Sequence, residues 1–147
     1  MATMALPLNF EVVETDIDFV NSSVKFANRC GVVVRVAWKA MILAVVLGQI
    51  VEKQNELISK LNDAPLDSFT DDKLITLAVR IEQLVARNDN LLELASQKIR
   101  EYGIWNAQLS QIEVQRDTLD SMAESYRAAT DSEHQALLVA ALETMCA

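Results

Sequence analysis

The sequence predicts an all-α protein, an antiparallel bundle of four or five helices that includes a long, coiled-coil-like hairpin. The chain of 147 residues contains only three Gly and two Pro. Its abundant Ala, Leu, Glu, Gln and Arg favour helix. Apolar residues also recur every seven positions over much of the second half, as they do in packed helices. The length fits one helical-bundle domain, residues 1–147, with enough chain to bury a core.

The chain is predicted to begin with a lead-in and then to form a long helix. Residues 1–14 make up the lead-in, and Thr15 is the expected N-cap. Asp16 and Asp18 follow in the first turn, where their negative charge favours the helix dipole. The helix then runs toward Leu61.

A break in this helix at Gly31 is left open by the sequence. Residues 28–31 have the pattern of a C-cap, and the next three residues are β-branched valines. A short buried strand at residues 32–36 is the alternative to helix. No second strand-like run offers that strand a partner, so a helix with a possible kink is the favoured interpretation.

Residues 62–69 form the clearest interhelical loop. Pro65 restricts the preceding Ala64 to extended conformations, and the neighbouring Asn, Asp and Ser are typical of turns. Thr70 is the expected N-cap of the next helix.

The helix over residues 71–102 shows a coiled-coil pattern with one polar core position, Asn88. Such an Asn either sets register or oligomer state, or lies at the edge of a layer where it meets water. The two core positions of the repeat contain Leu74, Ile81, Asn88, Ala95 and Tyr102, and Leu77, Leu84, Leu91 and Lys98.

A further seven-residue seam follows Gly103 and predicts a long helix with one buried stripe. Gly103 alone need not end a helix, so residues 71–129 form either one rod or two helices. The seam contains Trp105, Ile112, Leu119 and Tyr126, supported by Leu109, Met122 and Ala129.

The pattern of a capping box at residues 130–133, with Thr130 and Glu133 three positions apart, predicts the start of a last helix. Residues 136–145 are apolar on most sides of that helix. A short helix is marginal alone. We therefore expect it to dock elsewhere, and the first long helix is a candidate surface.

The most apolar stretch, residues 30–51, sets the functional hypothesis. Residues 31–51 are long enough to span a bilayer. However, Arg35 and Lys39 would each cost about 2.5–3.5 kcal/mol near its centre. The stretch is therefore interpreted first as a core helix.

A helical wheel carried in one phase from Glu14 to Lys60 places apolar side chains of this stretch on the same face as the polar residues. Contiguous exposed apolar surface usually marks a binding site. We expect it to be shielded by a second copy of the protein, by another segment of the chain, or by a membrane. The predicted partner-binding residues are Val32, Trp38, Ile42, Leu43, Val46 and Ile50.

The sequence offers little chemistry, and no catalytic, cofactor-binding or metal-binding residues are predicted. His134, the only histidine, follows Asp131 by three positions, but carboxylate-bridged metal bundles need this motif twice. Cys30 and Cys146 match no metal or redox spacing. The N-terminus lacks the features of a signal peptide, so a cytoplasmic protein with reduced thiols is expected.

Three hypotheses for function follow from these patterns. The first is a non-enzymatic protein that binds itself or another protein through an apolar helix face. The second is a membrane-active protein that inserts residues 31–51. The third is an acidic inhibitor or chaperone of a basic partner, acting through residues 104–147, which contain seven acids and two bases. A net charge of −8 argues against nucleic acid as a ligand.

Overall fold

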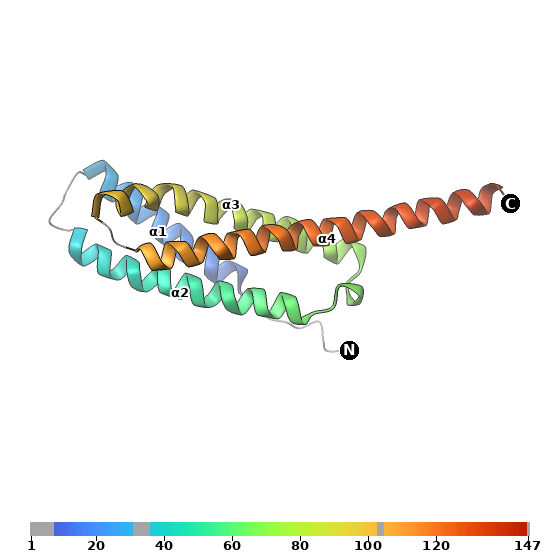
Figure 1. The fold of residues 1–147 in the computed structure, drawn as a ribbon, viewed down its shortest axis with the longest axis horizontal. Coiled ribbons are helices and arrows are strands. Elements are labelled where there is room, and N and C mark those ends of the chain that lie inside the picture. Colours follow the sequence, from blue (N-terminus) through green and yellow to red (C-terminus); the bar gives the residue numbers. More distant parts are fainter. Residues whose placement is uncertain (1–7, 31–35, 103–104, 147) are drawn as a thin grey trace.

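The protein is a bundle of four α-helices (Figure 1). The structure, a computed structural model, describes residues 8–30, 36–102 and 105–146, and all regular structure in that part of the chain is helical. This confirms the predicted all-α class. The elements are α1 (Phe10–Cys30), α2 (Val36–Asp63), a short 3-10 turn η2 (Leu66–Ser68), α3 (Asp71–Tyr102) and α4 (Asn106–Cys146).

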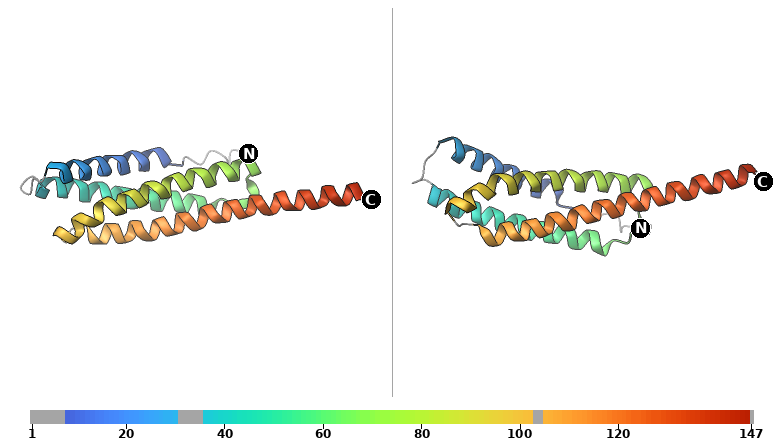
Figure 2. Two further views of the ribbon diagram at one scale, coloured as in Figure 1. Left: turned by 90° about the horizontal axis from the view of Figure 1, so that it is seen from above. Right: turned by 45° about the horizontal axis from the view of Figure 1, so that its top comes forward.

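Consecutive helices run in opposite directions but are not all neighbours (Figures 1 and 2). The contacts between elements join α1 to α2 and α3, and α4 to α2 and α3. The helices therefore form a ring in the order α1, α2, α4, α3. As a result, α2 and α3 face each other across the core although they follow each other in the chain.

Helix α1 begins earlier than predicted. It starts at Phe10, where the amide of Val13 donates to the carbonyl of Asn9 at 3.1 Å. The expected cap, Thr15, lies inside the helix and donates its hydroxyl to the Glu11 carbonyl at 2.8 Å. The prediction of a lead-in over residues 1–14 is thus wrong from Phe10 onward. The buried α1 stripe of Phe10, Val13, Ile17, Val20 and Val24 explains why, because its spacing already begins at Phe10.

The long helix predicted toward Leu61 is instead two antiparallel helices. Helix α1 ends at Cys30, and α2 begins at Val36. Residues 32–35 of the alternative strand lie outside the described residues. Buried α2 positions alternate in steps of three and four, the spacing of a coiled-coil seam. They are Leu43, Leu47, Ile50, Gln54, Leu57 and Leu61, and Val51 is buried beside this series.

The loop before α3 agrees with the prediction. Helix α2 ends at Asp63, Pro65 precedes η2, and Thr70 caps α3. The Thr70 hydroxyl accepts a hydrogen bond from the Lys73 amide at 3.3 Å. The predicted heptad positions of α3 from Leu74 to Ala95 are all buried.

The α3–α4 segment is two helices rather than one rod. The chain turns back between Tyr102 and Asn106, and Trp105 adopts a left-handed backbone conformation with φ 67°. The side chain of Trp105 is buried, and its carbonyl accepts the Leu109 amide at 2.9 Å. Packing of this indole holds a backbone conformation that a bulky residue rarely adopts.

Helix α4 continues without a break to Cys146, so the predicted helix start at Thr130 is wrong. The Thr130 hydroxyl instead donates to the Tyr126 carbonyl at 3.0 Å, a bond within one helix. With 41 residues, against 32 in α3 and 28 in α2, α4 projects past the rest of the bundle (Figure 1). Its C-terminal end points away from the start of α2. Residues 136–145 therefore do not cover the apolar stretch of α2, although the sequence analysis named that region as a candidate docking surface.

A buried polar layer crosses the core and joins three helices. Asn88 Nδ2 donates to Gln54 Oε1 at 2.8 Å, and Gln54 Nε2 donates to Gln115 Oε1 at 2.9 Å. Gln115 Nε2 in turn lies 2.7 Å from the Val51 carbonyl. Asn88 is therefore a buried, hydrogen-bonded core residue rather than a solvated layer edge. Its Oδ1 atom has no partner in the described chain, so the layer gives alignment at some cost in stability.

The layer also determines where the surface ion pairs form. Lys53, next to Gln54, contacts Asp16 at 2.9 Å. Arg87, next to Asn88, pairs with Asp18, and its Nε lies 3.4 Å from Glu14. These ion pairs align α2 and α3 with α1. Helix α1 itself contributes no residue to the Gln54–Asn88–Gln115 hydrogen bonds.

We expect Asn88→Ala to lower the free energy of unfolding by about 1–3 kcal/mol, because Gln54 Oε1 then loses its buried donor. Urea unfolding followed by circular dichroism measures this change. Asn90→Ala, on an exposed position of the same helix, is the matched control and should shift stability by less than about 0.5 kcal/mol. Equal effects of the two substitutions would show that the layer does not stabilise the fold.

Candidate functional site

The six predicted partner-binding residues do not form one exposed patch. Leu43 and Ile50 are 5% and 0% exposed and belong to the chain's own core, so other segments of the chain shield them, one of the three possibilities that the sequence left open. Ile42 and Val46 are half-buried. Val32 lies outside the described residues, as does the side chain of Trp38.

The single helical wheel from Glu14 to Lys60 treats α1 and α2 as one helix. A wheel keeps its phase only along a continuous helix, and the chain breaks between Cys30 and Val36. The sector of α2 that this wheel joins to the polar side of α1 is mixed: Gln49 and Glu56 are exposed, whereas Leu43 and Ile50 lie at its buried edge. The exposed apolar residues of α2 are instead Met41 and Val45, at 70% and 62%.

The structure reveals an apolar stripe on the outside of α1 that the sequence reasoning missed. Val12, Phe19 and Phe26 are 46%, 49% and 53% exposed and lie seven residues apart. We call these three residues the outer stripe. A signal for it exists, because α1 carries two apolar series with the same period, one buried and one exposed. The exposed series does not stand out in the sequence, because its first residue, Val12, lies within the predicted lead-in.

The α1–α2 pairing places half-buried residues of α2 beside this stripe. Lys53 contacts Asp16 through its ammonium group, and its carbonyl accepts Asn9 Nδ2 at 3.1 Å. Ile42 and Val46, further along the same helix, are half-buried. The outer stripe together with Ile42 and Val46 is termed the α1–α2 face.

Acidic residues on the other edge of α1 fix the direction of the outer stripe. Glu14 is buried and contacts Arg80 at 2.7 Å, while Asp18 pairs with Arg87 of the same helix α3. The Asp18 hydrogen bond raises the pKa of Arg87 above its ordinary value. The Arg80 guanidinium also lies 5.4 Å from the centre of the Phe10 ring. These contacts turn the acidic edge toward α3, so that the outer stripe points to solvent.

The two bases of residues 104–147 both pair with α3. Arg116 Nη1 lies 2.8 Å from Asp89, and Arg127 Nε lies 2.6 Å from Glu82. Hydrogen bonding from Arg127 lowers the pKa of the Glu82 carboxyl. These exposed pairs add little stability individually but support the α3–α4 alignment.

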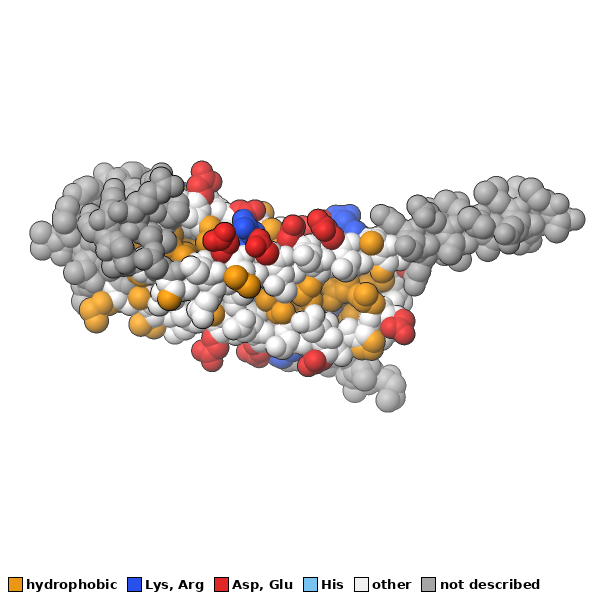
Figure 3. All heavy atoms as spheres, in the orientation of Figure 1, with side chains coloured by type: hydrophobic (Ala, Val, Ile, Leu, Met, Phe, Trp, Pro, Cys, Tyr) orange, Lys and Arg blue, Asp and Glu red, His pale blue; other side chains and the backbone are white. Residues whose placement is uncertain are grey.

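Two hollows lie along the furrow between α2 and α4. The larger, of about 550 Å³, is bounded by the end of α2, the following loop and the middle of α4, and the smaller, of about 360 Å³, lies nearer the start of α4. Figure 3 shows hydrophobic side chains gathered along this furrow. The described residues that line the two hollows are uncharged at neutral pH, so they can offer apolar contact and hydrogen bonds.

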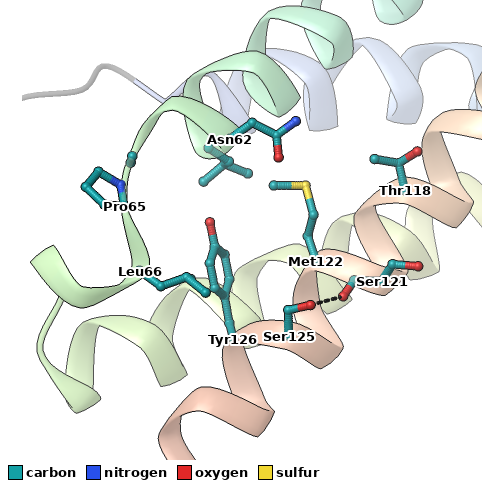
Figure 4. Close-up of a pocket in the computed structure, with 10 residues that line it drawn as sticks. Asn62, Pro65, Leu66, Thr118, Ser121, Met122, Ser125 and Tyr126 are labelled. Carbon is teal, nitrogen blue, oxygen red and sulfur yellow. Dashed lines mark hydrogen bonds between the residues drawn. The ribbon is translucent and has the colours of Figure 1, made fainter.

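Tyr126 forms part of the floor of the larger hollow. Its ring reaches from α4 toward Leu66 and Pro65, beside Met122 and Asn62 (Figure 4). The residue is only 3% exposed, and this burial raises the pKa of the phenol above its ordinary value.

The described residues contain neither a metal-binding cluster nor a membrane-spanning helix. No three His, Cys, Asp or Glu residues in that part of the chain lie close enough to hold a metal ion. The side chains of His134, Cys30 and Cys146 lie outside it. Within the described residues, no helix is both long and apolar enough to cross a membrane.

Comparisons with known proteins identify no relative. No protein-family model matches the chain, and neither the curated proteins nor the solved structures yield a significant match. A functional proposal must therefore start from the residues of this chain.

We expect the wild-type protein to lose stability above about pH 10 more steeply than Tyr126→Phe. Burial in the folded state raises the phenol pKa above its ordinary value of 10.0, so folding favours the protonated form. Its contribution is complete below pH 10.0 and is lost as the pH rises through the folded pKa. Urea unfolding at about pH 8 and about pH 10.5 measures the difference. Identical losses in the two proteins would contradict it.

Proposed function

We propose that this protein is a non-enzymatic protein-binding helical bundle and that the α1–α2 face is its binding surface. The observation that carries the proposal is the outer stripe, three large apolar side chains in line on one helix, each about half exposed. Single exposed apolar residues are ordinary, but a row at heptad spacing has the pattern of a helix that packs against a partner.

The composition around the stripe supports binding to protein. Two of its three residues are phenylalanines, and aromatic side chains are enriched at the centres of protein interfaces. Exposed polar residues border them on α1, as expected of an interface rim: Glu11, Thr15, Asp18, Ser22 and Lys25. Half-buried Ile42 and Val46 extend the apolar area onto α2.

The way in which α1 is held also favours binding. The helix is anchored by its buried stripe and by the ion pairs of Glu14 and Asp16 with α3 and α2. The phenylalanines are thus displayed from a fixed helix, and little ordering is needed when a partner docks. A surface arranged in advance loses less conformational freedom on binding.

Photo-cross-linking from the stripe tests the proposal. With p-benzoylphenylalanine in place of Phe19, we expect discrete cross-linked products in cells that express the protein natively. The ring at this position would lie within an interface. The same group in place of Asn90, an exposed position on α3, is the control and should give few products.

Circular dichroism of both variants first establishes that the helices are intact. Equal cross-linking from the two positions, or none from position 19, would overturn the assignment of the α1–α2 face. The mass of each product identifies whether the partner is another protein or a second copy.

A further inference from the structure

We infer that the partner of the outer stripe is a second copy of this chain, with the two α1 helices antiparallel across a two-fold axis at Phe19. This inference rests on the proposed function and names the partner of the same surface. It follows from the symmetry of the stripe and from the charges beside it.

The stripe is symmetric about its middle residue. Val12 and Phe26 each lie seven residues from Phe19, or about 10 Å at 1.5 Å per residue. In an antiparallel pair Phe19 meets its equivalent, while each Val12 meets Phe26 of the other copy. A small side chain thus faces a large one at both ends. A parallel pair would instead place Phe26 on Phe26 and Val12 on Val12.

Charges beside the stripe favour the same arrangement. Glu11, Asp18 and Lys25 are exposed and form one row along its edge. Equivalent edges of antiparallel helices face each other, so Glu11 would stand opposite Lys25 of the second copy, twice per dimer. In a parallel pair non-equivalent edges face each other, so Glu11 would approach the edge that bears Asp16 and gain no opposite charge. Neither Glu11 nor Lys25 forms an ion pair with the described residues of its own chain.

The residue at the centre of the charged row does not oppose this pairing. Asp18 would approach its equivalent near the axis, but it already pairs with Arg87 of its own chain. Between the stripe and the charged row lie Thr15 and Ser22, which are small, and the Thr15 hydroxyl donates to the Glu11 carbonyl. The Thr15 hydroxyl therefore keeps its hydrogen-bond partner when a second helix packs against α1.

The expected dimer is weak. A stable dimer commonly buries about 800 Å² on each partner, and one helix stripe with a few α2 residues provides less. We therefore expect a monomer–dimer equilibrium in the full-length chain within the range of about 1–200 µM, measured by sedimentation equilibrium. Phe19→Ser should weaken the dimer by at least about tenfold, with helix content and melting temperature retained.

Charge reversal tests the arrangement. Glu11→Lys and Lys25→Glu should each weaken the homodimer by about fivefold, because each creates two like-charge pairs. An equimolar mixture of these two variants should regain wild-type affinity, since both flanking pairs become attractive again. The double variant Glu11→Lys/Lys25→Glu should regain it alone. Single variants as tight as wild type would overturn the antiparallel pairing.

Cysteine cross-linking gives an independent readout of direction. In a Cys30→Ser/Cys146→Ser background, Glu11→Cys mixed with Lys25→Cys should form a disulfide-linked dimer, and neither should do so alone. In the antiparallel pair two copies of residue 11 lie about 24 Å apart along the helix axes, and two copies of residue 25 about 18 Å. Efficient self-linking of either variant would contradict the arrangement.

Failure of this inference is distinguishable from failure of the proposed function. A chain that stays monomeric to about 200 µM, yet cross-links from position 19 to a different protein, overturns the second copy and leaves the binding surface in place. A monomeric chain without cross-links from position 19 overturns both.

Discussion

The hydrogen-bonded layer of Gln54, Asn88 and Gln115 is the constraint on which the other contacts depend. Apolar heptad stripes can slide past each other by a turn at modest cost, whereas buried amides must meet their partners or remain unsatisfied. The layer spans the diagonal from α2 to α3 and continues to α4. Because Lys53, Arg87 and Arg116 each adjoin a layer residue, the same alignment brings their charges to Asp16, Asp18 and Asp89.

This alignment reaches the surface through α1. Ion pairs from α2 and α3 hold the two edges of α1, and its buried stripe fills the space between those helices. What remains is a third face that no described helix covers, and this face carries Val12, Phe19 and Phe26. A core built to hold one register thus also presents the outer stripe in one orientation. Binding through that stripe would require no rearrangement of the bundle.

Much of the second half of the fold could be predicted because its signals are local. Thr70 caps α3, the heptads of residues 74–95 are buried, and the seam from Trp105 to Tyr126 lies in the core. A local signal gave a wrong prediction where one sequence pattern is compatible with two structures. Thr130 with Glu133 has the spacing of a capping box, but Thr130 bonds back to Tyr126 inside a continuous helix. The candidate site failed for a longer-range reason, since the phase of a wheel is lost between Cys30 and Val36.

The amino-acid sequence by itself determined that the chain is helical, which positions on α3 and α4 are buried, and that Asn88 is a polar core residue. These properties follow from propensity and spacing, which act over a few turns of one helix. Only the tertiary structure decided that α2 lies diagonal to α3, that Leu43 and Ile50 face inward, and that the outer stripe lies on a solvent-exposed side of α1. Which face of a helix is covered depends on the neighbours that surround it, and the connections at residues 31–35 and 103–105 carry no local pattern that names those neighbours.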